Sequence, residues 1–353
     1  MAARVEDAGA TLSVPDANGR WESVTLAYHL RPPYPDLSFA RTDHGWTYWL
    51  PRPDVDRVEY LIECRDRAGD TTRTVDETNP RRVPGVFGQA SVLEFLGYLV
   101  PYWLRWQAPT GERAAMSLPH GRGLRRDLPV ELFSPDGLAE DEAAPLLLVH
   151  DGPEMDRFAA LTHYCAAMVA AGVLRPHRVG LLEPRDRDAW YSASPAYARS
   201  LAHHAVPAIL DSVPTIGRPV LAGASLGALA ALHAEWTSPG TFAGLFLASG
   251  SFFQMRYDSH EQHVGRFFRI SSAVERILDA PAAPSNIPIA MVCGTGEENW
   301  ENNQAMAAAL RRAGRPVDVV PFRDGHTWVG WRDALHPTLT GLLARLWDGS
   351  GEH

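Results

Sequence analysis

The segment Arg218–Leu232 constrains the fold of this chain more than any other part of the sequence, because it contains the run Gly223-Ala224-Ser225-Leu226-Gly227. A short apolar stretch leads into Gly223, and alanines and leucines that favour a helix follow Gly227. This pattern predicts a strand, a sharp turn and a helix. A serine on such a turn needs close neighbours without side chains, and the two glycines supply that room. We therefore expect Ser225 to be a nucleophile held between a strand and a helix.

From about residue 128 onward, apolar runs alternate with segments of helical length. Such alternation is typical of an α/β domain, in which crossover helices pack on a mostly parallel sheet. The predicted strands are Val130–Phe133, Leu146–His150, Arg178–Leu182, Pro219–Gly223, Gly244–Ala248, Ile289–Cys293 and Val317–Phe322. The predicted helices are Arg157–Ala171, Pro195–Leu210, Leu226–Glu235, Asn302–Ala313 and Trp331–Trp347.

The first part of the chain has a different period. Between Trp21 and about Trp106, apolar residues occur at alternate positions, as at Val58, Tyr60 and Ile62, and turn-forming clusters separate the runs. This is strand periodicity, and it predicts a small β-sandwich. We therefore expect a tail at 1–20, a β-sandwich at 21–110, a linker containing three glycines and one proline at 111–127, and an α/β domain at 128–353.

Composition excludes several classes of protein. The formal net charge is −9 and no long run of Lys or Arg occurs, which disfavours a nucleic-acid partner. No apolar run is long enough to span a membrane, and the N-terminus lacks the apolar segment of a secretion signal. The three cysteines are far apart, without the spacing of a zinc site or the density of a disulfide scaffold. We expect a cytoplasmic protein without metal or cofactor, and the sequence gives no indication of its oligomeric state.

A serine hydroxyl becomes a good nucleophile only when a neighbouring base removes its proton. In an α/β-hydrolase fold the histidine follows the last strand, and His326 follows the predicted strand Val317–Phe322 in a turn with Gly325. We interpret Asp324, in the same turn, as a solvated residue. The sequence therefore predicts His326 as the base.

An acid that orients the histidine should follow the strand Ile289–Cys293. Two carboxylates satisfy this position, and spacing alone does not separate neighbours. We prefer Glu297 and keep Glu298 as the alternative acid.

The oxyanion that forms during attack on an ester needs two N–H donors. The amide of Leu226 lies at the predicted helix N-terminus, where it can supply one. The second should come from the loop that follows Leu146–His150, where Pro153 has no N–H to donate. Gly152 is therefore the candidate for the second donor, with Glu154 as the alternative.

Substrate-binding candidates lie on the same predicted edge of the sheet. They are Asp151, Arg187, Trp190 and Tyr191. Arg187 can recognise an anionic group or form a structural salt bridge, since alternating charges usually pair. Trp190 and Tyr191 can line the pocket or pack in the interior.

Further motifs accompany these candidates. They are the Asp151-Gly152 loop, Arg187–Tyr191, Gly223–Gly227, Phe246–Phe253 and Asp324–Trp328 leading into Trp331-Arg332. Together they resemble the enterochelin esterase family and the wider esterase D group, from about Val130 to the end of the chain. Earlier, Asp76–Pro80 and Phe87–Ser91 look like parts of the immunoglobulin-like early-set domain that precedes such esterases. The resemblance implies an α/β-hydrolase domain, a sandwich that can form one wall of the pocket, and hydrolysis of a ferric siderophore lactone.

These inferences lead to one hypothesis and two alternatives. The hypothesis is hydrolysis of a small-molecule ester or lactone through an acyl-serine intermediate. The first alternative is a feruloyl or acetyl esterase acting on carbohydrate esters, or an acyltransferase, with the same catalytic residues. The second is a binding protein that keeps a catalytically inactive hydrolase fold.

Overall fold

The computed structural model describes residues 3–31, 33, 35–107, 110–118, 124, 126–263 and 265–348. The chain divides into two compact units. The first unit comprises Met1–Val100, Gly294–Glu298 and Phe322–Gly330, and the second comprises Pro101–Cys293, Asn299–Pro321 and Trp331–His353. Two short loops from the C-terminal part of the chain therefore belong to the first unit.

The first unit is built from two antiparallel sheets. One is four-stranded with the order β1-β2-β5-β4, and the other is five-stranded, with the order β3-β6-β9-β8 and β7 paired to β6. The strands are β1 Arg4–Glu6, β2 Gly9–Pro15, β3 Trp21–Tyr28, β4 Ala40–Thr42, β5 Gly45–Pro51, β6 Arg57–Asp66, β7 Thr71–Thr74, β8 Arg82–Gly85 and β9 Gly88–Glu94.

Side chains from both sheets share one core. Val58, Tyr60 and Ile62 of β6 are buried at alternate positions, and Leu12 of β2 belongs to the same cluster. This alternation arises because successive side chains of a strand point to opposite faces. The predicted all-β sandwich is confirmed as two antiparallel sheets over a common core.

The expected tail at 1–20 is wrong, because it contains β1 and β2. Ala10 and Leu12 of β2 are fully buried, and β2 pairs along its whole length with β5. Only a few apolar residues alternate here, so the pattern is weak within the segment itself. Its burial comes from β5 and the opposite sheet, which are distant in the sequence.

The expected linker at 111–127 is also wrong in part. Gly111–Leu118 forms β10, which pairs antiparallel with β11 at the edge of the sheet of the second unit. The low apolar content that suggested a linker reflects an edge strand with mostly exposed residues. Residues 119–123 and 125, also predicted as linker, lie outside the described residues.

The second unit contains an eight-stranded sheet with the order β10-β11-β13-β12-β14-β15-β16-β17. Strands β12 to β16 run parallel to one another, whereas β11 pairs antiparallel with β13 and β10 pairs antiparallel with β11 at one edge. All residues of β14 are buried, as expected of a strand covered on both faces. The strands that follow β10 are β11 Leu128–Pro135, β12 Leu146–His150, β13 Arg178–Leu182, β14 Val220–Ala224, β15 Gly244–Ala248, β16 Ile289–Gly294 and β17 Val317–Phe322.

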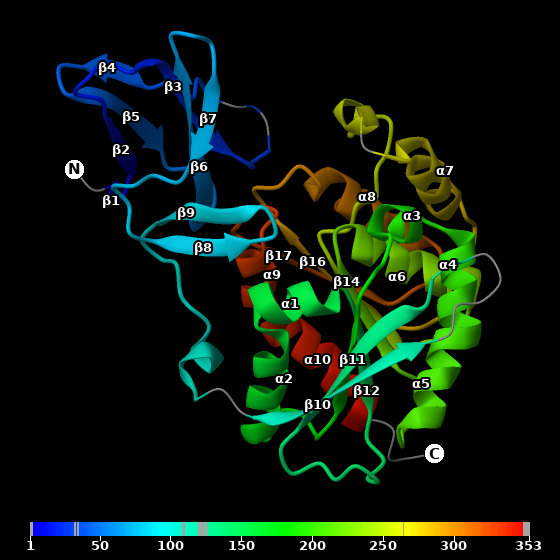
Figure 1. The fold of residues 1–353 in the computed structure, drawn as a ribbon. Helices are drawn as coiled ribbons and strands as arrows, with labels where there is room; N and C mark the ends of the chain where they lie inside the picture. The colour runs from blue at the N-terminus through cyan, green and yellow to red at the C-terminus, as the bar shows by residue number, and fades with distance from the viewer. Residues whose placement is uncertain are drawn as a thin grey trace. The chain divides into compact units, whose positions relative to one another are not determined.

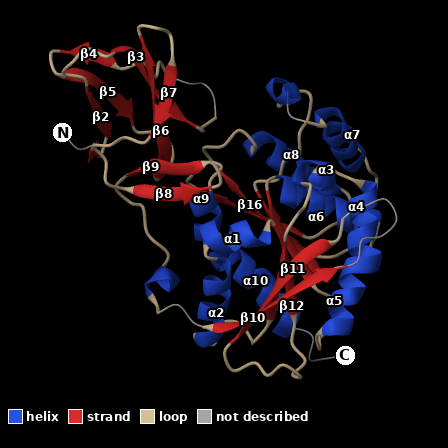
Figure 2. Cartoon of the chain, viewed as in Figure 1, coloured by secondary structure: helices blue, strands red, loops and turns tan. Residues whose placement is uncertain are grey.

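Helices flank this sheet (Figures 1 and 2): α1, α2 and α10 lie on one side, and α4, α5 and α6 on the other. None of the helices in the described segments is both long and apolar enough to cross a membrane. The helices are α1 Gly152–Ala159, α2 Leu161–Ala170, α3 Arg187–Tyr191, α4 Pro195–Ser200, α5 Val206–Ser212, α6 Leu226–Thr237, α7 Phe267–Leu278, α8 Trp300–Arg312, α9 Trp328–Asp333 and α10 Leu335–Asp348. Short 3-10 turns occur at Tyr102–Arg105 and Ser259–His263, and a π-helical turn at Leu201–Ala205.

The predicted α/β-hydrolase class with a mostly parallel sheet is confirmed. The serine strand lies one residue later than predicted, at Val220–Ala224. The predicted helix Pro195–Leu210 is a continuous helical segment in which the π-helical turn joins α4 to α5. Helix α7 was not predicted, although Phe267, Ile270 and Val274 are buried at helical spacing along it.

Candidate active site

Ser225 occupies a strained turn between β14 and α6. Its backbone has φ 56° and ψ −124°, and it is the residue that precedes the first turn of α6. A residue other than glycine in such a region costs about 1–3 kcal/mol, which the surrounding structure must offset. Ser225 N–H donates to the Ala248 carbonyl at 2.9 Å, and its own carbonyl accepts from Ser251 N–H at 3.1 Å. The turn is therefore held by the last residue of β15 and by the segment that follows this strand.

The two glycines of the turn have a steric reason. A Cβ at Gly223 would collide with the carbonyl group of Gly227, so the strand and the helix approach too closely for a side chain. A Cβ at Gly227 would lie 3.1 Å from the Cβ of His150, at the end of β12. The sequence-based explanation of both glycines therefore agrees with the geometry.

Sequence reasoning included Ser251 only within the Phe246–Phe253 motif and gave it no role in the site, yet its hydroxyl oxygen lies 3.2 Å from that of Ser225. Asn303 of α8 holds its loop by accepting from Gly250 N–H at 3.0 Å and donating to the Gly250 carbonyl at 2.8 Å. Trp331 donates from its indole to Ser249 Oγ at 2.9 Å. The available signal was position, since this loop follows the strand next to β14 and therefore starts at the same sheet edge.

The loop after β12 begins with Asp151 in the left-handed region, at φ 50° and ψ 39°. Gly152 starts α1, and a Cβ there would collide with the backbone of Leu181. The first N–H groups of a helix have no partner within the helix. Gly152 and Leu226 are thus both the first residues of helices, α1 and α6.

Arg187 forms a fork with Asp151. Its Nε lies 2.9 and 3.0 Å from the two carboxylate oxygens, and its Nη2 lies 2.8 Å from Oδ2. The Asp151 side chain is 4% exposed and that of Arg187 is 39% exposed, so the ion pair lies at the border of the interior. The structure therefore realises the salt-bridge interpretation of Arg187, and Asp151 is its partner.

Trp190 and Tyr191 are both buried in the core of the second unit. Trp190 stacks on Tyr197 at 5.6 Å, and Tyr191 contacts His150 at 4.6 Å between ring centroids. These contacts correspond to the packing interpretation of the two aromatic residues rather than to the pocket-lining one.

His150 lies beneath the turn that carries Ser225. It is fully buried, and its Nδ1 lies 2.8 Å from the Gly227 carbonyl, so Nδ1 carries the proton. Burial lowers the pKa of His150 to about 4, although the contact with Gly227 opposes this shift. His150 is therefore neutral at pH 7 and supports the first turn of α6.

Glu297 and His326 meet within the first unit. Glu297 Oε2 lies 2.5 Å from His326 Nδ1, and Oε1 accepts from Gly294 N–H at 2.5 Å. The Glu297 side chain is buried, whereas Glu298 is exposed. Of the two carboxylates considered from the sequence, Glu297 is the one that contacts the histidine.

The interpretation of Asp324 as a solvated residue is wrong, because it is 6% exposed. Arg57 of β6 donates to its Oδ2 at 2.6 Å. Burial raises the pKa of Asp324 to about 7, while Arg57 opposes the shift. The partner lies far away in the sequence, so local pattern gave no signal for this burial.

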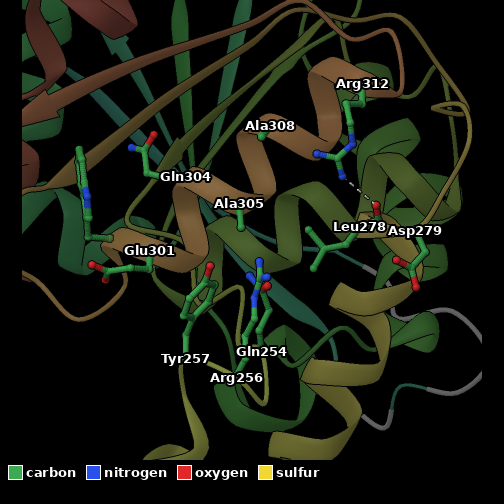
Figure 3. Close-up of a pocket in the computed structure, with 11 residues that line it drawn as sticks. Gln254, Arg256, Tyr257, Leu278, Asp279, Glu301, Gln304, Ala305, Ala308 and Arg312 are labelled. Atoms are coloured by element: carbon green, nitrogen blue, oxygen red, sulfur yellow. Dashed lines mark hydrogen bonds between the residues drawn. The ribbon is translucent and has the colours of Figure 1, made fainter.

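The second unit also has an open cavity of about 640 Å³ beside α8 (Figure 3). Arg256 and Tyr257 lie on one wall, and Gln304, Ala305 and Ala308 of α8 lie on another. None of the site residues predicted from the sequence lines this cavity. Within the described residues, no three His, Cys, Asp or Glu side chains form a group able to hold a metal ion.

Comparisons with known proteins identify the family of the chain. Residues 121–342 match the model of the esterase family, described as "Putative esterase". No curated protein matches the chain. Among solved structures, a ferric enterobactin esterase from Salmonella typhimurium superposes with a TM-score of 0.76 and 20% identity, over 96% of this chain and 94% of that one.

Two further structures are similar. Enterochelin esterase from Shigella flexneri has a TM-score of 0.73 and 20% identity, over 96% of this chain and 94% of its own. A ferulic acid esterase has a TM-score of 0.55 and 18% identity, over 68% of this chain and 99% of its own. With the family model covering most of the second unit, the chain belongs to the esterase family of carboxylic ester hydrolases.

Proposed function

We propose that this esterase hydrolyses its substrate through an acyl-serine intermediate on Ser225. His326 takes the Ser225 proton as the hydroxyl oxygen attacks the ester carbonyl, and then gives it to the leaving alcohol. Water, activated by the same histidine, releases the acid in the second half of the reaction. Glu297 fixes the orientation and tautomer of His326 throughout.

The backbone of Ser225 is the observation that carries this proposal. Its φ of 56° at the start of α6 is a strained arrangement that the fold maintains with the Ala248 and Ser251 contacts. Strain of this kind concentrates at functional positions. The contact of the buried Glu297 carboxylate with His326 at 2.5 Å adds support, because a carboxylate accepts the proton of Nδ1 and leaves Nε2 as the basic nitrogen.

The order of the sheet also supports the proposal. β14, β15 and β16 are parallel and adjacent, and β17 borders β16. Parallel strands end at one edge of a sheet, where ligands bind in open α/β folds. Ser225 follows β14, Glu297 follows β16 and His326 follows β17. The chain order serine, acid, histidine is that of α/β-hydrolases.

We propose Leu226 and Gly152 as the backbone donors to the oxyanion. Each is the first residue of a helix, so its N–H has no partner within that helix and lies at the positive end of the helix dipole. Pro153 has no N–H, which leaves Gly152 as the preferred donor of its loop.

For the substrate we propose an ester or lactone of siderophore type. The support is the extent of structural likeness, which includes the first unit for the enterobactin esterases but only 68% of this chain for the ferulic acid esterase. A feruloyl or acetyl ester of a carbohydrate is the second candidate, on the likeness to the ferulic acid esterase. We further propose a reducing, cytoplasmic location, since the three cysteines Cys64, Cys165 and Cys293 are buried and not joined in disulfides.

A substrate panel tests the proposal. Purified protein is assayed on a catecholate trilactone, a feruloyl ester, an acetylated sugar and an activated short-chain ester, beside the Ser225→Ala variant. We expect hydrolysis of the short-chain ester and the fastest turnover on the trilactone, with all activity lost in the variant. Faster turnover of the feruloyl ester would favour the second substrate class, and ester transfer to added alcohols would indicate an acyltransferase. A folded protein that turns over no ester would support the binding-protein alternative.

A further inference from the structure

We propose that Arg57 and Asp324 are positioning residues for His326, so that the N-terminal β-sandwich takes part in catalysis by holding the histidine loop. This inference rests on the proposed function, in which His326 is the base. It assigns to the sandwich a role distinct from forming a pocket wall.

The central contact is a buried ion pair inside the first unit. Arg57 is 1% exposed, and its Nη1 donates to Asp324 Oδ2 at 2.6 Å. Its Nη2 donates to Glu59 at 3.0 Å, on the same strand β6. Arg57 and Asp324 are separated by more than half the length of the chain. Only the folding of the first unit therefore brings the two residues together.

Asp324 also contacts the two loops that carry His326 and Glu297. Its Oδ1 accepts from Gly325 N–H at 2.7 Å, which fixes the backbone immediately before His326. Its carbonyl accepts from Gly296 N–H at 3.1 Å, next to Glu297. One residue therefore joins the sandwich, the histidine loop and the acid loop, and it sets the positions from which Glu297 and His326 meet.

Backbone contacts reinforce the same arrangement. Asp56 N–H donates to the Arg323 carbonyl at 2.7 Å, and Arg31 N–H donates to the Gly296 carbonyl at 2.7 Å. Gly296 packs so closely on Val55 that a Cβ there would displace it. The sandwich thus bonds to the backbone of each loop at one residue, Arg323 before His326 and Gly296 before Glu297.

The chemistry of the pair favours a positioning role over a stabilising one. Burying two charges costs desolvation that their attraction only partly offsets, so apolar residues would serve folding as well or better. The pair instead orients the Asp324 side chain, because a guanidinium and a carboxylate bind each other in a fixed geometry. A small displacement of a catalytic group costs far more rate than stability.

Full-length variants test the proposal. Asp324→Asn keeps the side-chain volume but has only one side-chain oxygen. In the wild type, Arg57 and Gly325 N–H each donate to a different carboxylate oxygen of Asp324. Arg57→Met removes the donor with similar length. We expect kcat on an activated ester to fall about tenfold to a hundredfold, the loss typical of displacing a catalytic group by about 1 Å, with KM unchanged.

Two controls separate positioning from general stability. Arg323→Gln removes exposed ion pairs to Asp54 and Asp56 from the same loop, and Glu59→Gln removes the negative charge of the second carboxylate that Arg57 contacts. Both should keep full kcat. The readout specific to position is the downfield proton resonance of His326 Nδ1 in its bond to Glu297, assigned by its loss in His326→Ala. We expect this resonance to be retained in the controls and lost or shifted in Asp324→Asn and Arg57→Met.

The proposal is overturned if folded Asp324→Asn keeps both its kcat and the His326 resonance. If Arg57→Met does not fold, the result for Asp324→Asn alone tests the proposal. His326→Ala separates this failure from failure of the proposed function. If His326→Ala retains turnover, His326 is not the base. If His326→Ala is inactive while Asp324→Asn is unaffected, only the positioning role fails.

Discussion

The imidazole of His326 shares the Glu297 carboxylate with the backbone of Gly294. One carboxylate oxygen lies 2.5 Å from His326 Nδ1, and the other lies 2.5 Å from Gly294 N. Gly294 N–H can only donate, so each oxygen of Glu297 has a defined task. Replacing a single oxygen atom of the Glu297 carboxylate should therefore alter its bond to His326.

Glu297→Gln should lower kcat by about a thousandfold to ten-thousandfold. Gly294 N–H must face the amide oxygen, so the amide NH₂ faces His326 Nδ1 and forces the proton onto Nε2. The imidazole then has the wrong tautomer to accept the serine proton, and a wrong tautomer costs about that factor in serine proteases. The measurement is kcat for an activated ester.

Glu298→Gln is the matched control for that experiment. Glu298 is exposed beside the buried Glu297, so its substitution should leave kcat unchanged. If the two variants lost the same activity, or if only Glu298→Gln lost it, the assignment of the acid would be incorrect.

Gly223→Ala should destabilise the protein. Its Cβ would meet the Gly227 carbonyl group, which is backbone and has little freedom to move. Overpacking of this kind costs about 1–3 kcal/mol. The free energy of unfolding in urea measures the effect. Gly341→Ala is the control, since no atom lies near the added methyl in the exposed turn of α10 and the change should stabilise that helix. Equal effects of the two changes would contradict the steric account.

The serine turn could be predicted from the sequence because its determinants are local. Gly223 and Gly227 are required by contacts between neighbouring turns of the chain, and the strand and helix around Ser225 follow from short apolar patterns. The loop positions of His326 and Glu297 followed from the order of the strands. The structure then showed which of Glu297 and Glu298 faces the histidine, because that depends on backbone direction and not on spacing.

Other features depend on partners that are distant in the sequence. Asp324 is buried because Arg57 reaches it from β6, and β2 is a strand because β5 pairs with it. Neither partner can be identified from the local pattern. The same holds for Arg187, whose fork with Asp151 is set by the packing of α3 near the end of β12.

Arg187→Met should lower stability and leave KM unchanged. The substitution removes the guanidinium that pairs with the buried Asp151 carboxylate, which should lower the free energy of unfolding by about 1–3 kcal/mol. The loss is smaller than for a fully buried pair because the Arg187 side chain is 39% exposed. Arg185→Met removes only an exposed pair with Glu183 and should change stability by less than about 0.5 kcal/mol. Urea unfolding and KM for an anionic ester are measured on both. A raised KM with unchanged stability in Arg187→Met would instead favour substrate recognition by Arg187.

Stability should fall as the pH drops from about 6.5 toward 4. Burial lowers the pKa of His150 and of His177 to about 4, so the folded state stays neutral while the unfolded state takes up protons. Each histidine then contributes about 3 kcal/mol that is present above pH 6.5 and lost on acidification. Asp324 acts in the opposite sense, since its raised pKa favours the folded state at lower pH.

His177→Phe isolates one of these contributions. The phenyl ring can keep the contact with the Trp347 ring but does not titrate, so the loss of unfolding free energy between pH 7 and 4.5 should be smaller than in the wild type. An identical pH dependence in the two proteins would show that His177 does not contribute.

The most direct test of the central claim is the covalent labelling of Ser225. The folded protein is treated with a fluorophosphonate, and the adduct is located by mass spectrometry of its peptides. The account predicts one adduct, on Ser225, that is absent in Ser225→Ala and forms much more slowly in His326→Ala. An adduct on another residue, or ester hydrolysis that persists in Ser225→Ala, would contradict it.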